Sequence, residues 1–301
     1  MKHENRVVPY APGHLEALLK VVNAHVAALP PQEGVIDRTA LETIVNRPEA
    51  LWAHHTREHS IDAALVRMVA ISDDEVVGLA VAWHEIGGEH AHLPLLVFEP
   101  RAPGAAKALL GRIFDELRDR GCTSVATDER NPLGIGWFGV PDSWPHVLET
   151  MHQEGFSVAD GWVILTGRTD SIPVEPPRPA NEMITCVFVN NENMGEWRLE
   201  FFHDDKLVGE CETWAVPPHL ASCPGFHDWI TVEWVGVEEA FRRRGLAFWL
   251  LVKQMHYHLR AGRTRVALWT GPGNRPARAL YYRLGFSDGP ETFVLARSLA
   301  L

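Results

Sequence analysis

Residues 238–251 read EEAFRRRGLAFWLL, so that three arginines and a glycine stand directly before an apolar run. The preceding stretch, TVEWVGV, is rich in β-branched residues, and the apolar residues after the glycine recur at helical spacing. The first turn of a helix carries backbone N–H groups without intrahelical partners, at the positive end of the helix dipole. A glycine at this point lets an anion approach the backbone. The stretch therefore predicts a strand, a turn and a helix that together bind a phosphate group.

A second stretch, NRPARALYYRLGF at residues 274–286, has apolar residues at helical spacing and closes on a glycine. Together the two stretches resemble the GCN5-related N-acetyltransferase (GNAT) superfamily. Arg242, Gly245 and Ala247 match its Arg/Gln-x-x-Gly-x-Gly/Ala signature. The residues that match its later helix are Asn274, Ala277, Leu280, Tyr281, Leu284, Gly285 and Phe286.

The resemblance implies a binding site for acetyl-CoA as a cosubstrate. The backbone amides that would hold its pyrophosphate belong to Arg243, Arg244, Gly245, Leu246 and Ala247, and the side chain of Arg242 would flank them. The strand residues that would pair with the pantetheine arm and polarise the thioester carbonyl are Val235, Gly236 and Val237. Asn274 and Ala277 would lie beside the pantetheine, and Asn274 is also a good helix N-cap.

The resemblance also implies two catalytic residues. Tyr281 would donate a proton to the departing CoA thiolate as the general acid. Glu233 lies on the strand that leads into the site, where the family often has a glutamate, and it would accept the proton of the attacking amine. A charged residue on a half-exposed strand is the competing interpretation of Glu233. Further candidate bases, which the sequence does not rank, are Glu212, His227 and Asp228.

The chain has 301 residues, enough for two domains. The proline-rich stretch GRTDSIPVEPPRPANE reads as an extended linker, which predicts domains over residues 1–168 and 183–301 joined by residues 169–182. The order strand, hairpin, strand, helix, strand, helix, strand occurs on both sides of the linker, so we predict an internal duplication. With the resemblance, the expected fold class is α/β (α+β): two tandem GNAT-like domains, each a mixed, mostly antiparallel twisted sheet flanked by helices. The second copy lacks helices between its first strand and its hairpin.

The first copy keeps only a trace of the phosphate signature. In RAPGAA, Arg101, Gly104 and Ala106 have the same spacing, but the preceding turn is one residue shorter and a proline removes one backbone donor. When the later helices are aligned on their final Gly-Phe, Met151 stands opposite Tyr281, and a thioether cannot protonate a thiolate. We therefore expect the first copy to be degenerate and to act as a scaffold or in acceptor recognition.

The composition limits the possible partners. A formal net charge of -11 disfavours nucleic acid and favours a cationic or neutral small molecule. No secretion signal or membrane-spanning run is recognised, so we expect a cytoplasmic protein, a monomer or homodimer, with its four cysteines reduced. The cluster WHEIGGEHAH contains His84, His90 and His92, but its Gly-Gly favours a polar hairpin, and we predict no metal site.

The predicted function is an acetyl-CoA-dependent N-acetyltransferase. The resemblance implies that the acetyl group would pass directly to a primary amine of a small molecule in a ternary complex, and no cysteine or serine stands in a position that suggests a covalent intermediate. Two alternatives stay open: a non-catalytic protein that binds or senses acyl-CoA, and a protein N-acetyltransferase.

Overall fold

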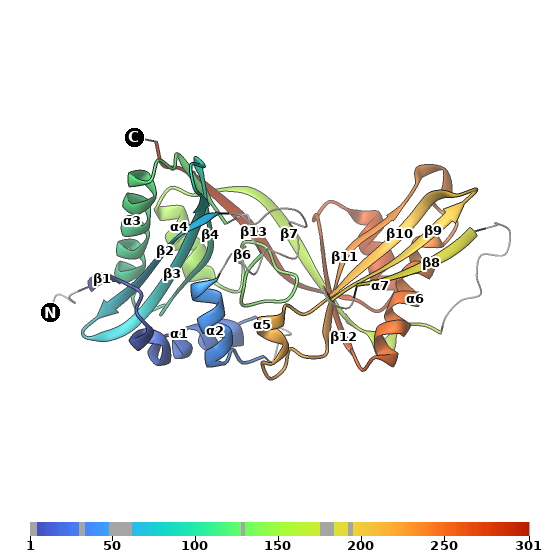
Figure 1. Ribbon diagram of the computed structural model, residues 1–301, viewed down its shortest axis with the longest axis horizontal. Helices are drawn as coiled ribbons and strands as arrows, with labels where there is room; N and C mark the ends of the chain where they lie inside the picture. Colours follow the sequence, from blue (N-terminus) through green and yellow to red (C-terminus); the bar gives the residue numbers. More distant parts are fainter. Residues whose placement is uncertain are drawn as a thin grey trace. The chain divides into compact units, whose positions relative to one another are not determined.

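The structure is a computed structural model that describes residues 5–29, 34–47, 62–127, 130–174, 184–191 and 195–300 (Figure 1). The chain forms two compact units. Unit 1 consists of Met1–Trp162, Ser222–Gly225 and Pro290–Leu301, and unit 2 consists of Val163–Ala221 and Phe226–Gly289. Each unit is a mostly antiparallel sheet flanked by helices, which is the predicted fold class.

Unit 1 has the strand order β1-β2-β3-β4-β5-β13, in which only β4 and β5 are parallel. Its strands are β1 (Asn5–Pro9), β2 (Ala63–Ser72), β3 (Glu75–Glu85), β4 (His90–Phe98), β5 (Ser124–Ala126), β6 (Val140–Pro141), which pairs with β13, and the part of β13 (Ser287–Ser298) from Pro290 onward. Its helices are α1 (Leu15–Ala27), α2 (Arg38–Asn46), α3 (Pro103–Asp119) and α4 (Pro145–Gln153). Helix α1 packs on β3 and β4, and α3 packs on β1, β2 and β3.

Unit 2 has the strand order β7-β12-β11-β10-β9-β8, in which only β11 and β12 are parallel. Its strands are the part of β7 (Ser157–Arg168) from Val163 onward, β8 (Ile184–Asn191), β9 (Glu196–His203), β10 (Lys206–Ala215), β11 (Trp229–Val237) and β12 (Arg265–Thr270). Its helices are α5 (Pro218–Ala221), α6 (Leu246–Arg260) and α7 (Arg275–Arg283). One face of α6 and one face of α7 share an apolar core with the sheet.

The two hairpins of the predicted duplication turn on the same dipeptide. Asp73 and Asp74 join β2 to β3 with φ values of 49° and 66°, and Asp204 and Asp205 join β9 to β10 with φ values of 49° and 61°. Two consecutive left-handed residues match the twist of the flanking strands, and aspartate tolerates this conformation better than most residues. Both hairpins of the predicted element order are present in the structure.

The last strand of each predicted copy belongs to the sheet of the other unit. Residues 163–168 of β7 pair with β12 in unit 2, and residues 296–298 of β13 pair with β5 in unit 1. The predicted division at residues 169–182 therefore differs from the division in the structure. The hydrophobic pattern of a strand shows that it is a strand and which face is buried, but the identity of its neighbour depends on long-range pairing.

The start of the predicted linker is tied to unit 2. Thr169 donates its backbone N–H to the carbonyl of Thr264 at 3.0 Å and its hydroxyl to the carbonyl of Arg263 at 2.7 Å. The later part of the linker, residues 175–182, lies outside the described residues. Strand β8 is followed by β9 with no helix between them in the described part of unit 2, as predicted, whereas α1 and α2 follow β1 in unit 1.

Candidate functional site

Strands β11 and β12 separate within unit 2. Their parallel pairing covers only Trp229–Val232 and Arg265–Leu268, although β11 continues to Val237 and β12 to Thr270. Strand β10 stays paired with β11 as far as Val237. In the described part of unit 2, the backbone groups of residues 234–237 that point away from β10 are therefore not paired with β12. An extended chain could form backbone hydrogen bonds in this opening.

A β-bulge lies where the two strands begin to separate. On β10, Glu212 pairs with Trp234 and Thr213 pairs with Val232, so Glu233 is the extra residue on β11 at this point of the register. An extra residue of this kind bends a strand and redirects the side chains that follow it. The sequence suggested Glu233 as a candidate base but gave no sign of the bulge, because a bulge is defined by the register of two strands.

The bulge reverses the alternation of side chains along β11. Val232 before the bulge faces the core under α6, and so do Val235 and Val237 after it. Glu233 and Trp234 therefore both point to the opposite face. Trp234 is 57% exposed there, which is unusual for an indole in the middle of a sheet. The sequence analysis did not select Trp234 as a site residue.

The turn between β11 and α6 has two left-handed residues. Arg243 has a φ of 62° and Gly245 a φ of 83°, and α6 begins at Leu246. The three arginines therefore precede the helix. Left-handed residues close to a helix start turn successive backbone N–H groups to one side, which favours an anion. No neighbouring atom lies within 4 Å of a Cβ added at Gly245, so the space beside it is open.

The arginine side chains hold the turn in place. Arg242 donates its Nε–H to the carbonyl of Val237 at 2.9 Å, and Arg244 donates to the carbonyl of Ala240 at 2.9 Å. The Arg244 guanidinium also lies 5.1 Å from the centre of the Phe241 ring. Their side chains fix the backbone, which leaves the amides of the turn as the groups best placed to bind a phosphate.

The two neighbouring tyrosines of α7 have different surroundings. Tyr281 is 6% exposed and lies in the core of unit 2, 5.9 Å from the Phe286 ring. Burial, with a smaller effect of the Cys211 thiol, raises the pKa of Tyr281 to about 12. Tyr282 points outward, and its hydroxyl bonds the Asp288 carboxylate at 2.8 Å. Tyr281 is therefore the tyrosine that faces the interior, protonated at neutral pH.

Asn274 caps α7. Its Oδ1 accepts a hydrogen bond from the N–H of Ala277 at 3.4 Å, and its Nδ2 donates to the hydroxyl of Thr270 at 3.0 Å. Ala277 is half-buried against the core. The N-cap role is thus present, and it fixes the start of α7 next to the end of β12, on the side where β11 and β12 separate.

Among the candidate bases, Glu233 and Glu212 lie beside the bulge. Glu233 accepts a hydrogen bond from the hydroxyl of Thr231 at 2.5 Å, and Glu212 accepts one from the indole N–H of Trp214 at 2.5 Å. These contacts orient both carboxylates. Glu233, as the bulge residue, lies at the point where β12 turns away.

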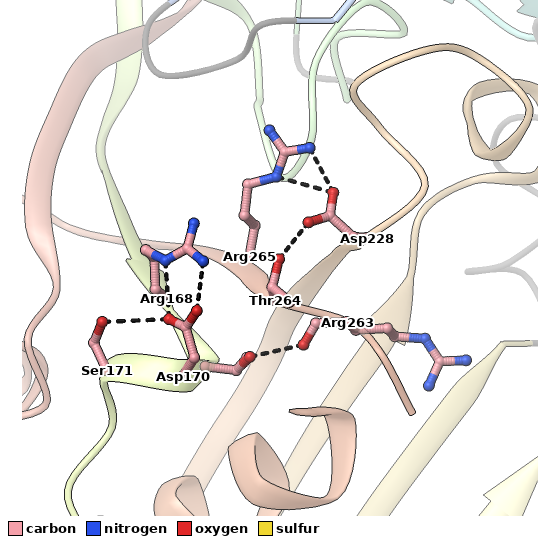
Figure 2. A network of polar contacts seen from close by, with 8 residues as sticks. Arg168, Asp170, Ser171, Asp228, Arg263, Thr264 and Arg265 are labelled. Atoms are coloured by element: carbon pink, nitrogen blue, oxygen red, sulfur yellow. Dashed lines mark hydrogen bonds and ion pairs between the residues drawn. The ribbon is translucent and has the colours of Figure 1, made fainter. Parts of the chain in front are cut away.

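Asp228 forms a structural contact between β11 and the start of β12 (Figure 2). Its carboxylate accepts hydrogen bonds from Nε and Nη2 of Arg265, at 2.9 Å and 2.5 Å, and from the hydroxyl of Thr264. Burial favours a higher pKa, but these hydrogen bonds outweigh it and hold the pKa of Asp228 below its ordinary value. Asp228 precedes the bulge by five residues, roughly 16 Å of extended strand. Asp228 ties the starts of β11 and β12 together. The exposed His227 lies one residue farther from the bulge.

The corresponding turn of unit 1 has a different structure. Helix α3 begins at Pro103, and Gly104 inside it is not left-handed. A Cβ added at Gly104 would lie 3.0 Å from Nδ2 of Asn5. Arg101 is paired with the carboxylates of Glu99 and Glu75, at 2.5 Å and 3.1 Å. These features are unfavourable for a phosphate group.

The later helix of unit 1 is also modified. Met151 is fully buried, and Trp144, at the position of the cap, makes no side-chain cap and instead donates its indole N–H to the carbonyl of His25 at 3.0 Å. His146 stacks edge-on against Phe98 at the end of β4, with 5.0 Å between ring centres. Aromatic side chains and imidazoles therefore occupy the space between β4 and α4.

The histidine cluster of unit 1 forms a hairpin. The ring of His92 stacks on Trp83 at 4.2 Å, and His90 bonds the hydroxyl of Ser124 at 3.0 Å. No group of three or more metal-ligating side chains is found in the described residues. None of the described helices is long and apolar enough to cross a membrane.

Comparison with known families identifies one match. Residues 168–286 match the family described as Acetyltransferase (GNAT) family, and this range contains the whole site described above. The search of curated proteins found no match.

Solved structures with the same fold cover both units. A tandem GNAT protein from the clavulanic acid biosynthesis pathway aligns over 99% of this chain and 99% of its own, with a TM-score of 0.63 and 16% identity. A GCN5-related N-acetyltransferase from Sphaerobacter thermophilus aligns over 99% and 96%, with a TM-score of 0.63 and 15% identity. A glucosamine N-acetyltransferase region of a fungal multi-domain GH3 β-N-acetylglucosaminidase gives a TM-score of 0.71 at 13% identity, and the 99% of this chain that aligns spans only 38% of that protein.

Proposed function

We propose that unit 2 transfers an acetyl group from acetyl-CoA to a primary amine, because residues 168–286 match the Acetyltransferase (GNAT) family and the whole chain is similar in fold to a tandem GNAT protein. The observation that carries the proposal is the opening between β11 and β12. The left-handed turn at Gly245 stands at one end of this opening, and the buried Tyr281 belongs to the helix that follows β12.

In this proposal the cofactor lies along β11. Its pantetheine amides pair with backbone groups of Val235, Gly236 and Val237 that face the opening, and its pyrophosphate meets the amides of residues 243–247. The anion needs no side chain at Gly245, which is consistent with the open space there. Asn274 uses one N–H of its Nδ2 group for Thr270, so its second N–H can donate a hydrogen bond to the pantetheine.

The chemistry requires two proton transfers. The amine nitrogen attacks the thioester carbon and forms the C–N bond, and its proton passes to Glu233 directly or through water. The tetrahedral intermediate then collapses, the C–S bond breaks, and Tyr281 gives its proton to the CoA thiolate. A tyrosine with a pKa of about 12 stays protonated until that moment, and solvent restores its proton afterwards.

Thermal unfolding with and without acetyl-CoA tests the cofactor site. Gly245→Trp adds its side chain in open space, so it should cost only the strain of a left-handed residue, and it should remove the stabilisation by acetyl-CoA that we expect for the wild type. Gly262→Trp is the matched control, since Gly262 has a φ of 78° and equally open space at the far end of α6. Equal stabilisation of both variants by acetyl-CoA would disprove this cofactor site.

Release of free CoA thiol with a panel of amines tests the reaction. Turnover with small primary amines supports a small-molecule acetyltransferase, and turnover only with lysine-containing or N-terminal peptides supports a protein N-acetyltransferase. Binding of acetyl-CoA without turnover on any amine would show that the chain is an acyl-CoA sensor.

A further inference from the structure

Residues of β10 and β11 and of the segment between β11 and α6 line a groove of about 220 Å³. Its lining includes Leu207, Glu210, Trp234, Gly236, Glu238 and Arg242, all within unit 2. The groove starts next to the bulge and follows β11 toward the turn before α6. None of the roles assigned above to the acetyl-CoA site explains why an indole is exposed here.

The bulge and a glycine together expose Trp234. The bulge turns Trp234 away from the core, and Gly236, two residues later on the same face, has no side chain to compete for the space. A Cβ added at Gly236 would lie 2.8 Å from the indole Nε1 of Trp234 and 3.2 Å from its ring carbon Cε2. The indole can therefore lie along the strand and offer a flat aromatic surface to the groove.

Two carboxylates flank this surface. Glu210 is opposite Gly236 on β10, and Glu238 directly follows β11. In the part of the chain that the structure describes, neither of these two carboxylates forms an ion pair. The one cationic side chain of the groove, Arg242, is bound to the carbonyl of Val237 and belongs to the proposed phosphate turn. An aromatic face with nearby carboxylates attracts a cation such as an ammonium group.

The distance between the proposed base and the groove indicates how long a ligand that reaches both must be. Glu233, the proposed base, and Gly236, the floor of the groove, are three residues apart on an extended strand, roughly 10 Å. Resting on the function proposed above, we propose that the acceptor is an extended polyamine-like molecule. Its primary amine would react beside Glu233, and a second ammonium group would lie over Trp234, between Glu210 and Glu238.

The test compares spermidine with hexylamine, which has one primary amine and no second charge. For the wild type, kcat/KM with acetyl-CoA should be about tenfold higher for spermidine, the order expected from cation–π and carboxylate contacts. Trp234→Ala and Glu210→Gln should each bring the ratio of the two kcat/KM values close to one, mainly through the KM for spermidine. Phe188→Ala is the control, because it removes another half-exposed aromatic side chain, on β8, outside the groove. It should leave the ratio unchanged.

Binding without acetyl-CoA separates this proposal from the reaction itself. Calorimetric titration should show that the wild-type protein binds spermidine and that Trp234→Ala binds it about tenfold more weakly. If the wild type binds spermidine and Trp234→Ala binds it more weakly, but no amine is acetylated, then the groove binds polyamines and the proposed reaction is wrong. If amines are acetylated but the wild type uses spermidine and hexylamine equally well, or if Trp234→Ala keeps the preference, the groove is not an acceptor site.

Discussion

At the scale of single residues, Tyr281 and Tyr282 are adjacent in sequence but differ in surroundings, and only Tyr281 reaches the interior of unit 2. Tyr281→Phe should lower kcat by about 10²–10⁴-fold, because it removes the proposed proton donor. Since the pKa of Tyr281 is raised to about 12, the acid stays protonated, and its titration should cause no loss of wild-type rate between pH 7 and pH 10. The measurement is kcat across this pH range for both proteins.

The control for this prediction is Tyr282→Phe, which loses only a surface contact with Asp288 and Arg278. Its kcat should match the wild type. An unchanged rate for Tyr281→Phe at every pH would exclude Tyr281 as the acid.

Some of these residues could be selected from sequence and some could not. Gly245 and Asn274 stand in local signals, a glycine before a helix and an N-cap, and the structure has a left-handed residue and a cap at these positions. The exposure of Trp234 could not be predicted, because it depends on a bulge that exists only in the pairing of β11 with β10. By simple alternation from Val232, Trp234 would face the core.

At the scale of elements, β11 and β12 pair with each other only over their first four residues, so side-chain contacts at this end help to hold the two strands together. Asp228 joins them through Arg265 and Thr264. Folding lowers the pKa of Asp228, so its carboxylate stabilises the fold above the ordinary carboxyl pKa, and this contribution is lost as the pH falls through the lowered value. Asp228→Asn should therefore cost about 1–3 kcal/mol at pH 7 and progressively less as the pH falls through the lowered pKa, as measured by urea unfolding.

Asp170→Asn provides the comparison for Asp228→Asn. Asp170 pairs with Arg168 at 2.5 Å in the same region, but both side chains are largely exposed, and exposed pairs contribute little to stability (Figure 2). A loss of stability for Asp170→Asn as large as that for Asp228→Asn would show that the tie between β11 and β12 is not special.

The pattern of elements was more predictable than their partners. The hairpins with paired aspartates, the strand before the phosphate turn and the helix with Tyr281 all follow from local periodicity and turn chemistry. The placement of β7 in the sheet of unit 2 and of β13 in the sheet of unit 1 does not follow from local patterns, because an apolar strand pattern does not identify the neighbouring strand. Only the pairing of β7 with β12 and of β13 with β5 reveals it.

At the scale of the whole molecule, this exchange decides which fragments are complete. A fragment of residues 183–301, the second domain expected from sequence, lacks β7 and leaves the β12 edge without its neighbour. It also carries residues 296–298 without their partner β5. A fragment of residues 160–289 contains every strand of unit 2. We expect only the second fragment to show cooperative thermal unfolding by circular dichroism.

The converse result would be equally clear. If residues 183–301 unfold cooperatively and residues 160–289 do not, then β7 does not belong to the sheet of unit 2 in solution. A point variant in the full chain gives an independent check, since Leu165→Asp would place a charge in the buried centre of β7 and should destabilise unit 2.

The placement of β13 also affects when the protein can fold during its synthesis. Domains of a growing chain generally fold as they emerge, starting from the N-terminus. Unit 1 cannot follow this order to completion, because residues 290–298 must leave the ribosome before β5 has its antiparallel neighbour. While unit 2 is translated, the sheet of unit 1 therefore has an unpaired edge at β5. Ribosome-bound chains that stop before residue 290 should depend more on chaperones than the released protein.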